Sequence, residues 1–201
     1  VEVVVGAPPD LAAIIPRCPQ LRWVQSTWAG IDAIAHFASE TLQITPLKGV
    51  FGPAMTEYVM GWLLAIERNV ISRASHTQWT PSLEPRITDK RMGIMGTGDI
   101  GAAIALAAKS FGVEVIGLNS DGRAVDGFTA CYPSTDRLAF AERLDYLVSV
   151  LPQTAQTDNL IGHEVLTRLN PGAIVINAGR GNAVVEADLI ASLSAGHVRA
   201  A

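Results

Sequence analysis

A glycine-rich segment in the middle of the chain has the spacing of a pyrophosphate-binding turn. It reads G-x-G-x-x-G, follows an apolar run and opens an alanine-rich helical pattern. In such a turn the first glycine permits the bend, the second lets the backbone approach the pyrophosphate, and the third lets the helix pack closely on the strand. A turn built for packing alone is the alternative. The segment predicts a dinucleotide site at Gly96, Thr97, Gly98, Asp99, Ile100 and Gly101.

The end of the following strand selects between two nucleotides. A NAD site carries an acid about 20 residues after the turn, whereas a NADP site avoids that acid and offers an arginine. Asn119 stands where the acid would be, and Ser120, Asp121 and Arg123 follow. Arg123 can reach a 2′-phosphate, which Asp121 would repel, and a solvated loop cation is an equal alternative for Arg123. The balance slightly favours NADP over NAD as cofactor.

Arg180 is a candidate for binding an acid, because it lies between Gly179 and Gly181 after another apolar strand. A planar, permanently charged guanidinium matches the geometry of a carboxylate. From the residues alone, a structural arginine paired with a nearby acid is an equal alternative.

The elements that must position these residues alternate between β-rich and helical runs, which predicts parallel strands with crossover helices. A helix is expected over 100–111 and a short strand near 128–132. The other strands of this part are expected at 91–95, 113–118, 146–150 and 173–177. Right-handed crossovers then give a doubly wound Rossmann-type sheet of the α/β class, with ligands at the carboxyl ends of the strands.

A domain boundary is expected near residue 50, where Pro46, Gly49, Gly52 and Pro53 cluster. Residues 1–50 form a small α/β lobe with a helix at 31–37, and residues 51–201 form the dinucleotide-binding lobe. The chain opens at Val1 within a strand pattern and stops at Ala201 as another strand begins. We therefore expect a fragment of a longer protein, truncated at the C-terminal end of its second lobe.

A long helix is expected over 53–75, because apolar residues recur there at spacings of three and four. One broad apolar face must be covered. Packing within the chain and a subunit interface are both compatible with this pattern.

Composition excludes several classes of function. A formal net charge of −4 with 17% charged residues predicts no nucleic-acid partner. The apolar stretch 59–66 is far shorter than the roughly 18 residues of a membrane span, so no membrane partner is expected. Cys18 and Cys131 are too few and too far apart for a disulfide framework or a metal site. We expect a protein of the reducing cytoplasm.

Further segments complete a family pattern. LPQTAQT at 151–157 follows the fourth strand of the second lobe, and INAGRG at 176–181 follows the fifth, ahead of EADL at 186–189. Together with the glycine turn they resemble the D-2-hydroxyacid dehydrogenase family. The segments 72–79 and 119–123 look most like its glyoxylate/hydroxypyruvate reductase branch.

The resemblance implies an NAD(P)-dependent oxidoreductase that reduces a small 2-oxo acid, such as glyoxylate or hydroxypyruvate, to the D-2-hydroxy acid. Arg180 would hold the substrate carboxylate and polarise the keto group. In residues 1–50, part of a flavodoxin-like substrate lobe, the backbone of a family segment would bind the same carboxylate. That segment corresponds to Trp28, Ala29 and Gly30, where Trp28 is a pocket wall or ordinary packing between lobes. The cofactor would also contact Leu151, Pro152, Thr154, Thr157, Ala178 and Gly179.

The resemblance also implies a histidine proton donor oriented by a glutamate, and neither has a counterpart among these residues. His36, His76, His163 and His197 lie outside the matching position. The 201-residue chain by itself is therefore expected to be inactive. A homodimer through the 53–75 helix is suggested. Alternatives are a corepressor-like dinucleotide sensor without activity, or an enzyme for a phosphorylated or bulkier acid or formate.

Overall fold

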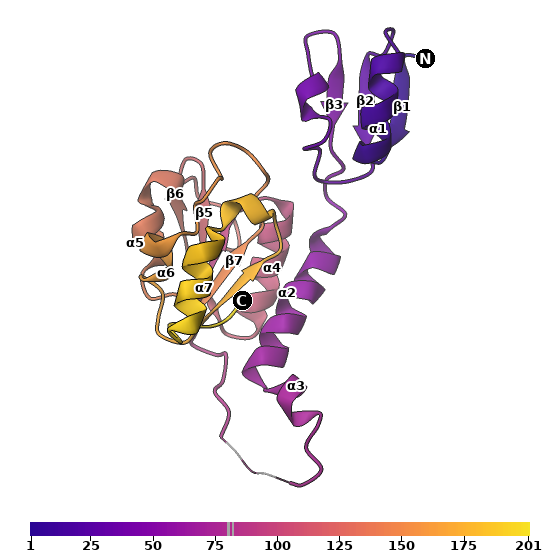
Figure 1. Cartoon of the computed structure of the whole chain (residues 1–201). Coiled ribbons are helices and arrows are strands. Elements are labelled where there is room, and N and C mark those ends of the chain that lie inside the picture. Colours follow the sequence, from indigo (N-terminus) through magenta and orange to yellow (C-terminus); the bar gives the residue numbers. More distant parts are fainter. Residues whose placement is uncertain (80, 82) are drawn as a thin grey trace. The chain divides into compact units, whose positions relative to one another are not determined.

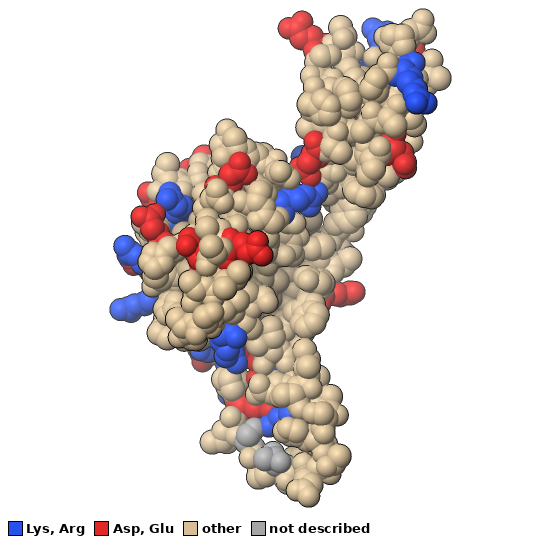
Figure 2. All heavy atoms as spheres, viewed as in Figure 1, with Lys and Arg blue, Asp and Glu red and all other residues tan. Residues whose placement is uncertain are grey.

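The computed structural model describes residues 1–79, 81 and 83–201, which form two compact units, Val1–Phe51 and Gly52–Ala201. Each unit has its own parallel sheet and its own apolar core (Figure 1). On the face shown in Figure 2, acidic and basic side chains are intermixed on both units. Within the described residues, every helix is too short or too polar to cross a bilayer.

The first unit is a three-stranded parallel sheet in the order β1-β2-β3. Its core is made by Leu11, Ile15, Leu21, Val24 and Ile34. The strands are β1 Val3–Gly6, β2 Trp23–Ser26 and β3 Gln43–Thr45, and the helical segments are α1 Pro8–Ile14, η1 Ile15–Arg17 and η2 Ala35–Phe37.

The expected helix at 31–37 is wrong, because only Ala35–Phe37 is helical and it is a 3₁₀ turn. Ile34 N–H donates to Ile31 O, and Phe37 N–H donates to Ile34 O, both with the three-residue spacing. A segment this short gains too few hydrogen bonds to offset the cost of nucleating an α-helix.

The second unit is a six-stranded parallel sheet in the order β6-β5-β4-β7-β8-β9. Its strands are β4 Arg91–Met95, β5 Glu114–Asn119, β6 Ala130–Pro133, β7 Tyr146–Ser149, β8 Ala173–Asn177 and β9 Val198–Ala200. Numbered within the unit, this is the 3-2-1-4-5-6 order of a dinucleotide-binding sheet. The prediction of an α/β protein with a Rossmann-type doubly wound sheet is confirmed.

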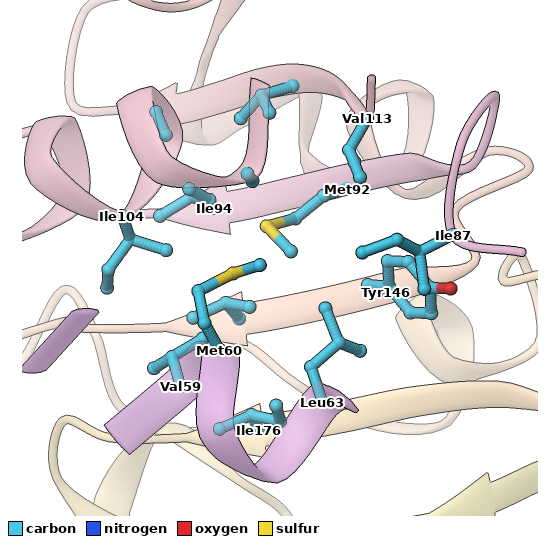
Figure 3. Packing of buried hydrophobic residues seen from close by; sticks show 14 of the residues in the cluster. Val59, Met60, Leu63, Ile87, Met92, Ile94, Ile104, Val113, Tyr146 and Ile176 are labelled. Atoms are coloured by element: carbon cyan, nitrogen blue, oxygen red, sulfur yellow. The ribbon is translucent and has the colours of Figure 1, made fainter. Parts of the chain in front are cut away.

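Helices cover both faces of this sheet because the strands are apolar on both sides. On one face α2 (Gly52–Glu67) and α4 (Asp99–Ser110) pack against β4, β7 and β8. Figure 3 shows Val59, Met60 and Leu63 of α2 in one cluster with Met92 of β4, and the Met60 side chain points toward that of Met92. The opposite face is covered mainly from α5 Arg137–Ala141 and α6 His163–Leu166, with a contribution from α7 Glu186–Ser194.

The long helix expected over 53–75 is wrong at its C-terminal end. α2 stops at Glu67, and Asn69 takes a left-handed conformation, φ 51°, before the short helix α3 (Val70–Arg73). Asparagine tolerates this conformation better than most side chains. α2 buries one face against the sheet and leaves Tyr58 and Trp62 about half exposed, at 50% and 46%.

A buried polar group fastens the end of α2 to the sheet. Glu67 is 3% exposed; its Oε1 accepts a 2.8 Å hydrogen bond from the Tyr146 hydroxyl and lies 2.9 Å from the guanidinium of Arg199. Burial, followed by the neighbouring Glu67 carboxylate, raises the pKa of Tyr146 far above its usual value. Tyr146 therefore stays a hydrogen-bond donor throughout the working pH range.

Asp145 joins the starts of three strands. Its Oδ1 accepts from Lys90 Nζ at 2.9 Å and from Asn170 Nδ2 at 3.2 Å, and its Oδ2 accepts from the backbone N–H of Arg91 at 2.9 Å. Burial alone would raise the pKa of Asp145, but these hydrogen bonds and the Lys90 charge outweigh it and hold that pKa below the usual 3.8. The ionised form is therefore the one that stabilises the fold.

We expect Asp145→Asn to lower the free energy of unfolding at pH 7 by about 2 kcal/mol, because hydrogen bonds to a charged acceptor are lost. The folded pKa lies below the unfolded value, so this contribution is complete above pH 3.8 and disappears as pH falls through the folded pKa. Urea unfolding of wild type and variant from pH 7 to pH 3 measures the difference. A difference that stays constant to pH 3 contradicts the assignment, and Glu142→Gln, at an exposed ion pair, is the matched control.

Candidate functional site

The candidate site lies where the strand order reverses, between β4 and β7. The segment after β4 leads to α4 on one face of the sheet, and the segment after β7 leads to α6 on the other. The two connections therefore diverge and leave a crevice at the carboxyl ends of the strands. A cavity of about 560 Å³ opens there, lined by Gly96, Thr97, Gly98, Leu118, Asn119, Ser120, Arg123, Ser134, Leu151, Pro152, Thr154, Gln156, Thr157 and Leu160.

The glycine turn has three different local environments. Gly96 has φ 99°, a conformation that other residues rarely adopt. A Cβ on Gly101 would lie 2.0 Å from the carbonyl oxygen of Gly96, so α4 packs against the turn more closely than any side chain allows. A Cβ on Gly98 would meet no protein atom within 4 Å. The first and third glycines thus serve the fold, and the second faces open space.

Helix α4 begins directly beyond Gly98, which is its N-cap, and no side chain caps it. A helix N-terminus carries unsatisfied N–H groups and a partial positive charge. Together with the open space at Gly98, this end of the helix accommodates an anion close to the backbone.

The strand-end loop is held together by the side chain of Asn119. Its Nδ2 donates to Thr97 Oγ1 at 3.1 Å and to Arg123 O at 2.9 Å, and its Oδ1 accepts from the N–H of Gly122 at 2.6 Å. Arg123 pairs with Asp121 through NH1 and Oδ1 at 3.1 Å. The backbone N–H of Arg123, together with its guanidinium, holds the pKa of Asp121 below its usual value.

The loop after β7 is shaped by one hydroxyl group. Thr157 is 9% exposed; its Oγ1 accepts from the N–H of Thr154 at 2.9 Å and donates to Pro152 O at 2.7 Å. These bonds close a turn that presents Pro152, Thr154 and Gln156 to the cavity.

The Arg180 turn follows β8. Asn177 Nδ2 donates to Arg180 O at 2.9 Å, and Asn177 Oδ1 accepts from the N–H of Gly179 at 3.1 Å. A Cβ on Gly179 would lie 2.6 Å from Leu151 O, so this turn packs directly on the start of the β7 loop. Arg180 occupies the N-cap of η4 (Gly181–Ala183).

The other expected substrate segment belongs to the first unit. Trp28, Ala29 and Gly30 follow β2, the central strand of that sheet. The buried hydroxyl of Ser26 accepts from Trp28 N–H and donates to Trp28 O, both at 2.9 Å. The Trp28 backbone is therefore fixed while its side chain stays 50% exposed.

The cavity brings together part of the expected set: Gly96, Thr97, Gly98, Asn119, Ser120, Arg123, Leu151, Pro152, Thr154 and Thr157. Its lining does not include Asp99, Ile100, Gly101, Ala178, Gly179 or Arg180. Leu118, Ser134, Gln156 and Leu160 line it and were not expected. Ser134 directly follows β6, so its place at a strand's carboxyl end was the signal that could have found it.

Residues 60–201 match the family model described as "D-isomer specific 2-hydroxyacid dehydrogenase, NAD binding domain". Glyoxylate/hydroxypyruvate reductase B of Klebsiella pneumoniae is 31% identical over 206 residues, and that of Salmonella typhimurium is 33% identical over 203. Each alignment covers 94% of this chain and 62% of the relative. The chain thus spans less than two thirds of the length of these curated relatives.

Solved structures agree. The NADPH-dependent glyoxylate/hydroxypyruvate reductase of Sinorhizobium meliloti, in complex with NADP and sulfate, has a TM-score of 0.86 at 28% identity, covering 100% of this chain and 66% of its own. A D-isomer specific 2-hydroxyacid dehydrogenase family protein of Aeromonas salmonicida has a TM-score of 0.85 at 32% identity, covering 98% and 65%. The chain belongs to the D-isomer specific 2-hydroxyacid dehydrogenase family.

Proposed function

We propose that the complete protein is an oxidoreductase that uses NADPH or NADH to reduce a small 2-oxo acid, of the glyoxylate or hydroxypyruvate kind, to the D-2-hydroxy acid. The observation that carries this proposal is the cavity at the strand reversal, lined by the glycine turn within the matched family domain. Similarity to the glyoxylate/hydroxypyruvate reductases supports the substrate class.

The residues present fit the adenosine-diphosphate half of a dinucleotide. The uncapped start of α4 and the open space at Gly98 suit the pyrophosphate, and the 119–123 loop suits the ribose. Asp99, Ile100, Gly101, Ala178 and Gly179 contribute through the turns that they build. We propose NADP as the preferred cofactor, supported by the absence of an acid at Asn119 and by Arg123 in the lining. When bound, the nicotinamide supplies the hydride.

The substrate side rests on two segments. Arg180, at the carboxyl end of β8, binds the carboxylate of the 2-oxo acid with its guanidinium fork and polarises the keto oxygen. The second segment is Trp28, Ala29 and Gly30 of residues 1–50, which form part of the substrate lobe. We propose that its backbone also binds a substrate carboxylate, supported by the two hydrogen bonds that fix the Trp28 backbone to Ser26.

A proton donor must lie within hydrogen-bond reach of the keto oxygen. None of the four histidines is among the residues that line the cavity in the described chain, and His197 is engaged with Leu166 O at 3.0 Å. We propose that the 201-residue chain alone binds the cofactor without turnover. We also propose a cytoplasmic location, supported by the small number of cysteines in the sequence, which are Cys18 and Cys131.

Two glycine substitutions separate binding from folding. We expect Gly98→Ala to lower the unfolding free energy by at most about 1 kcal/mol, because its Cβ meets no protein atom and only the poorer N-cap preference of alanine is felt. We expect the same change to weaken NADPH binding at least tenfold, because that Cβ occupies the phosphate approach. Gly101→Ala instead costs about 3 kcal/mol of stability, because its Cβ meets Gly96 O. Urea unfolding and NADPH fluorescence titration measure both. Unchanged NADPH affinity in a folded Gly98→Ala variant contradicts the proposed pyrophosphate site.

Arg180 tests the substrate assignment. In the complete protein we expect Arg180→Lys to lower kcat/KM for glyoxylate by about 100-fold, because an ammonium cannot replace a bidentate fork. NADPH affinity stays unchanged, because Arg180 does not line the cavity. Arg168→Lys, at an exposed ion pair beside the amino ends of the strands, is the control. Near-normal turnover of Arg180→Lys, followed by NADPH absorbance, rules out the bidentate role.

We propose that the complete protein is a homodimer through α2 and α3, the region expected as one 53–75 helix. Tyr58 and Trp62 lie one turn apart on the exposed face of α2, and Val70 and Ile71 of α3 are 53% and 64% exposed. Burial of such side chains stabilises an association through the hydrophobic effect.

Trp62→Glu in the complete protein is expected to give monomer, because a buried unpaired carboxylate opposes association. Leu106→Glu makes the same kind of change at a 70% exposed position of α4 and is expected to leave the dimer intact. Light scattering across a dilution series distinguishes the two states. A dimer that survives Trp62→Glu, or a wild-type protein that is monomeric, places the interface elsewhere or removes it.

A further inference from the structure

We propose that Asp121 competes with the 2′-phosphate of NADP for the guanidinium of Arg123. Because position 119 carries no acid that would exclude the phosphate, this internal competitor then sets how strongly the site discriminates NADP from NAD. The inference rests on the dinucleotide site proposed above and concerns its nucleotide specificity. It follows from the hydrogen bonds and the ion pair that the residues of the 119–123 loop make.

Asn119 stands at the strand-end position that would read the ribose, yet its side chain is occupied within the protein. Its amide nitrogen donates to Thr97 and Arg123, and its oxygen accepts from Gly122. A side chain that makes three internal hydrogen bonds gains little by turning toward a ribose, because each bond given up must be replaced. Asn119 therefore shapes the loop, and discrimination passes to the residues that the loop presents.

The loop presents two charges of opposite sign. Arg123 lines the cavity, and its NH1 lies 3.1 Å from Asp121 Oδ1. The Arg123 side chain is 60% exposed and that of Asp121 is 58% exposed, so both face water. The loop backbone keeps them adjacent: the N–H of Arg123 also donates to Asp121 Oδ1, and Gly122 has φ 75° with Pro133 directly behind it.

An exposed ion pair of this kind is weak, so a doubly charged phosphate can take the guanidinium from the carboxylate. The net free energy gained by binding the 2′-phosphate is reduced in two ways. The Arg123–Asp121 contact is lost, and the Asp121 carboxylate remains beside the phosphate and repels it. NAD, which has a free 2′-hydroxyl, neither breaks the Arg123–Asp121 contact nor places an anion beside Asp121. The geometry therefore predicts a moderate preference for the 2′-phosphate, held down by Asp121.

The test is calorimetric titration of the complete protein with adenosine 2′,5′-bisphosphate and with AMP, which lacks the 2′-phosphate. Asp121→Asn is nearly isosteric and keeps an oxygen that can accept the Arg123 N–H, so the loop is preserved. We expect it to strengthen bisphosphate binding about tenfold at low ionic strength, and less as salt is added, while AMP binding stays unchanged. Glu142→Gln makes the same charge change at an Arg168 ion pair beside the amino ends of the strands, and changes neither affinity.

The double variant identifies the mechanism. Arg123→Gln is expected to weaken bisphosphate binding about tenfold with no effect on AMP. Adding Asp121→Asn to that variant is expected to restore at most about twofold, because the competed cation is absent. A full tenfold gain in the Arg123→Gln background, or equal changes for both ligands, overturns the competition. If the wild-type protein binds AMP and adenosine 2′,5′-bisphosphate with equal affinity, this inference is overturned and the dinucleotide site stands. If neither ligand binds, the proposed dinucleotide site is overturned as well.

Discussion

The close packing of helix α4 on the turn before it is the constraint from which the site follows. Gly101 has no side chain, and a Cβ there would lie 2.0 Å from the Gly96 carbonyl oxygen. The helix can therefore start within the turn itself, with its uncapped N–H groups at the carboxyl edge of the sheet. Because the neighbouring connection after β7 crosses to the other face, this edge is open where the helix begins. Packing at one glycine thus places a positive helix end in a crevice.

Much of this arrangement could be predicted because it depends on local pattern. The strands expected at 91–95 and 173–177 have the same bounds as β4 and β8, because fully buried parallel strands appear in the sequence as continuous apolar runs. Local pattern does not predict the end of a helix where the backbone conformation of a single residue sets it. Asn69 interrupts the helix within the 53–75 segment but does not change the spacing of its apolar residues, so periodicity could not show where α2 ends. The prediction of a helix at 31–37 failed for a related reason. The apolar spacing around the 3₁₀ turn Ala35–Phe37 also suits an α-helix.

At the candidate site too, spacing predicted some features and could not predict others. Position 119 was recognised as a strand end, which is a matter of spacing, but the use of its side chain depends on Thr97, a residue 22 positions away. Ser134 and Leu160 reach the cavity from segments with no motif of their own, because sheet order brings the ends of β6 and β7 toward the same edge. Spacing can place a residue at an edge, and only the three-dimensional contacts show whether its polar atoms are available to a ligand.

Those contacts also join the two halves of the proposed chemistry. The cofactor-side loop after β7 and the Arg180 turn after β8 are hydrogen-bonded to each other: Asn159 N–H donates to Asn182 O, and Ile161 N–H donates to Ala183 O. The side chain of Asn182 donates to Asp158, and Gly179 packs on Leu151 with no room for a Cβ. A displacement of one segment therefore breaks bonds of the other. In the proposed reaction, hydride transfer depends on the distance between cofactor and substrate, so fastening the two loops together would fix the backbone of Arg180 relative to the cofactor cavity.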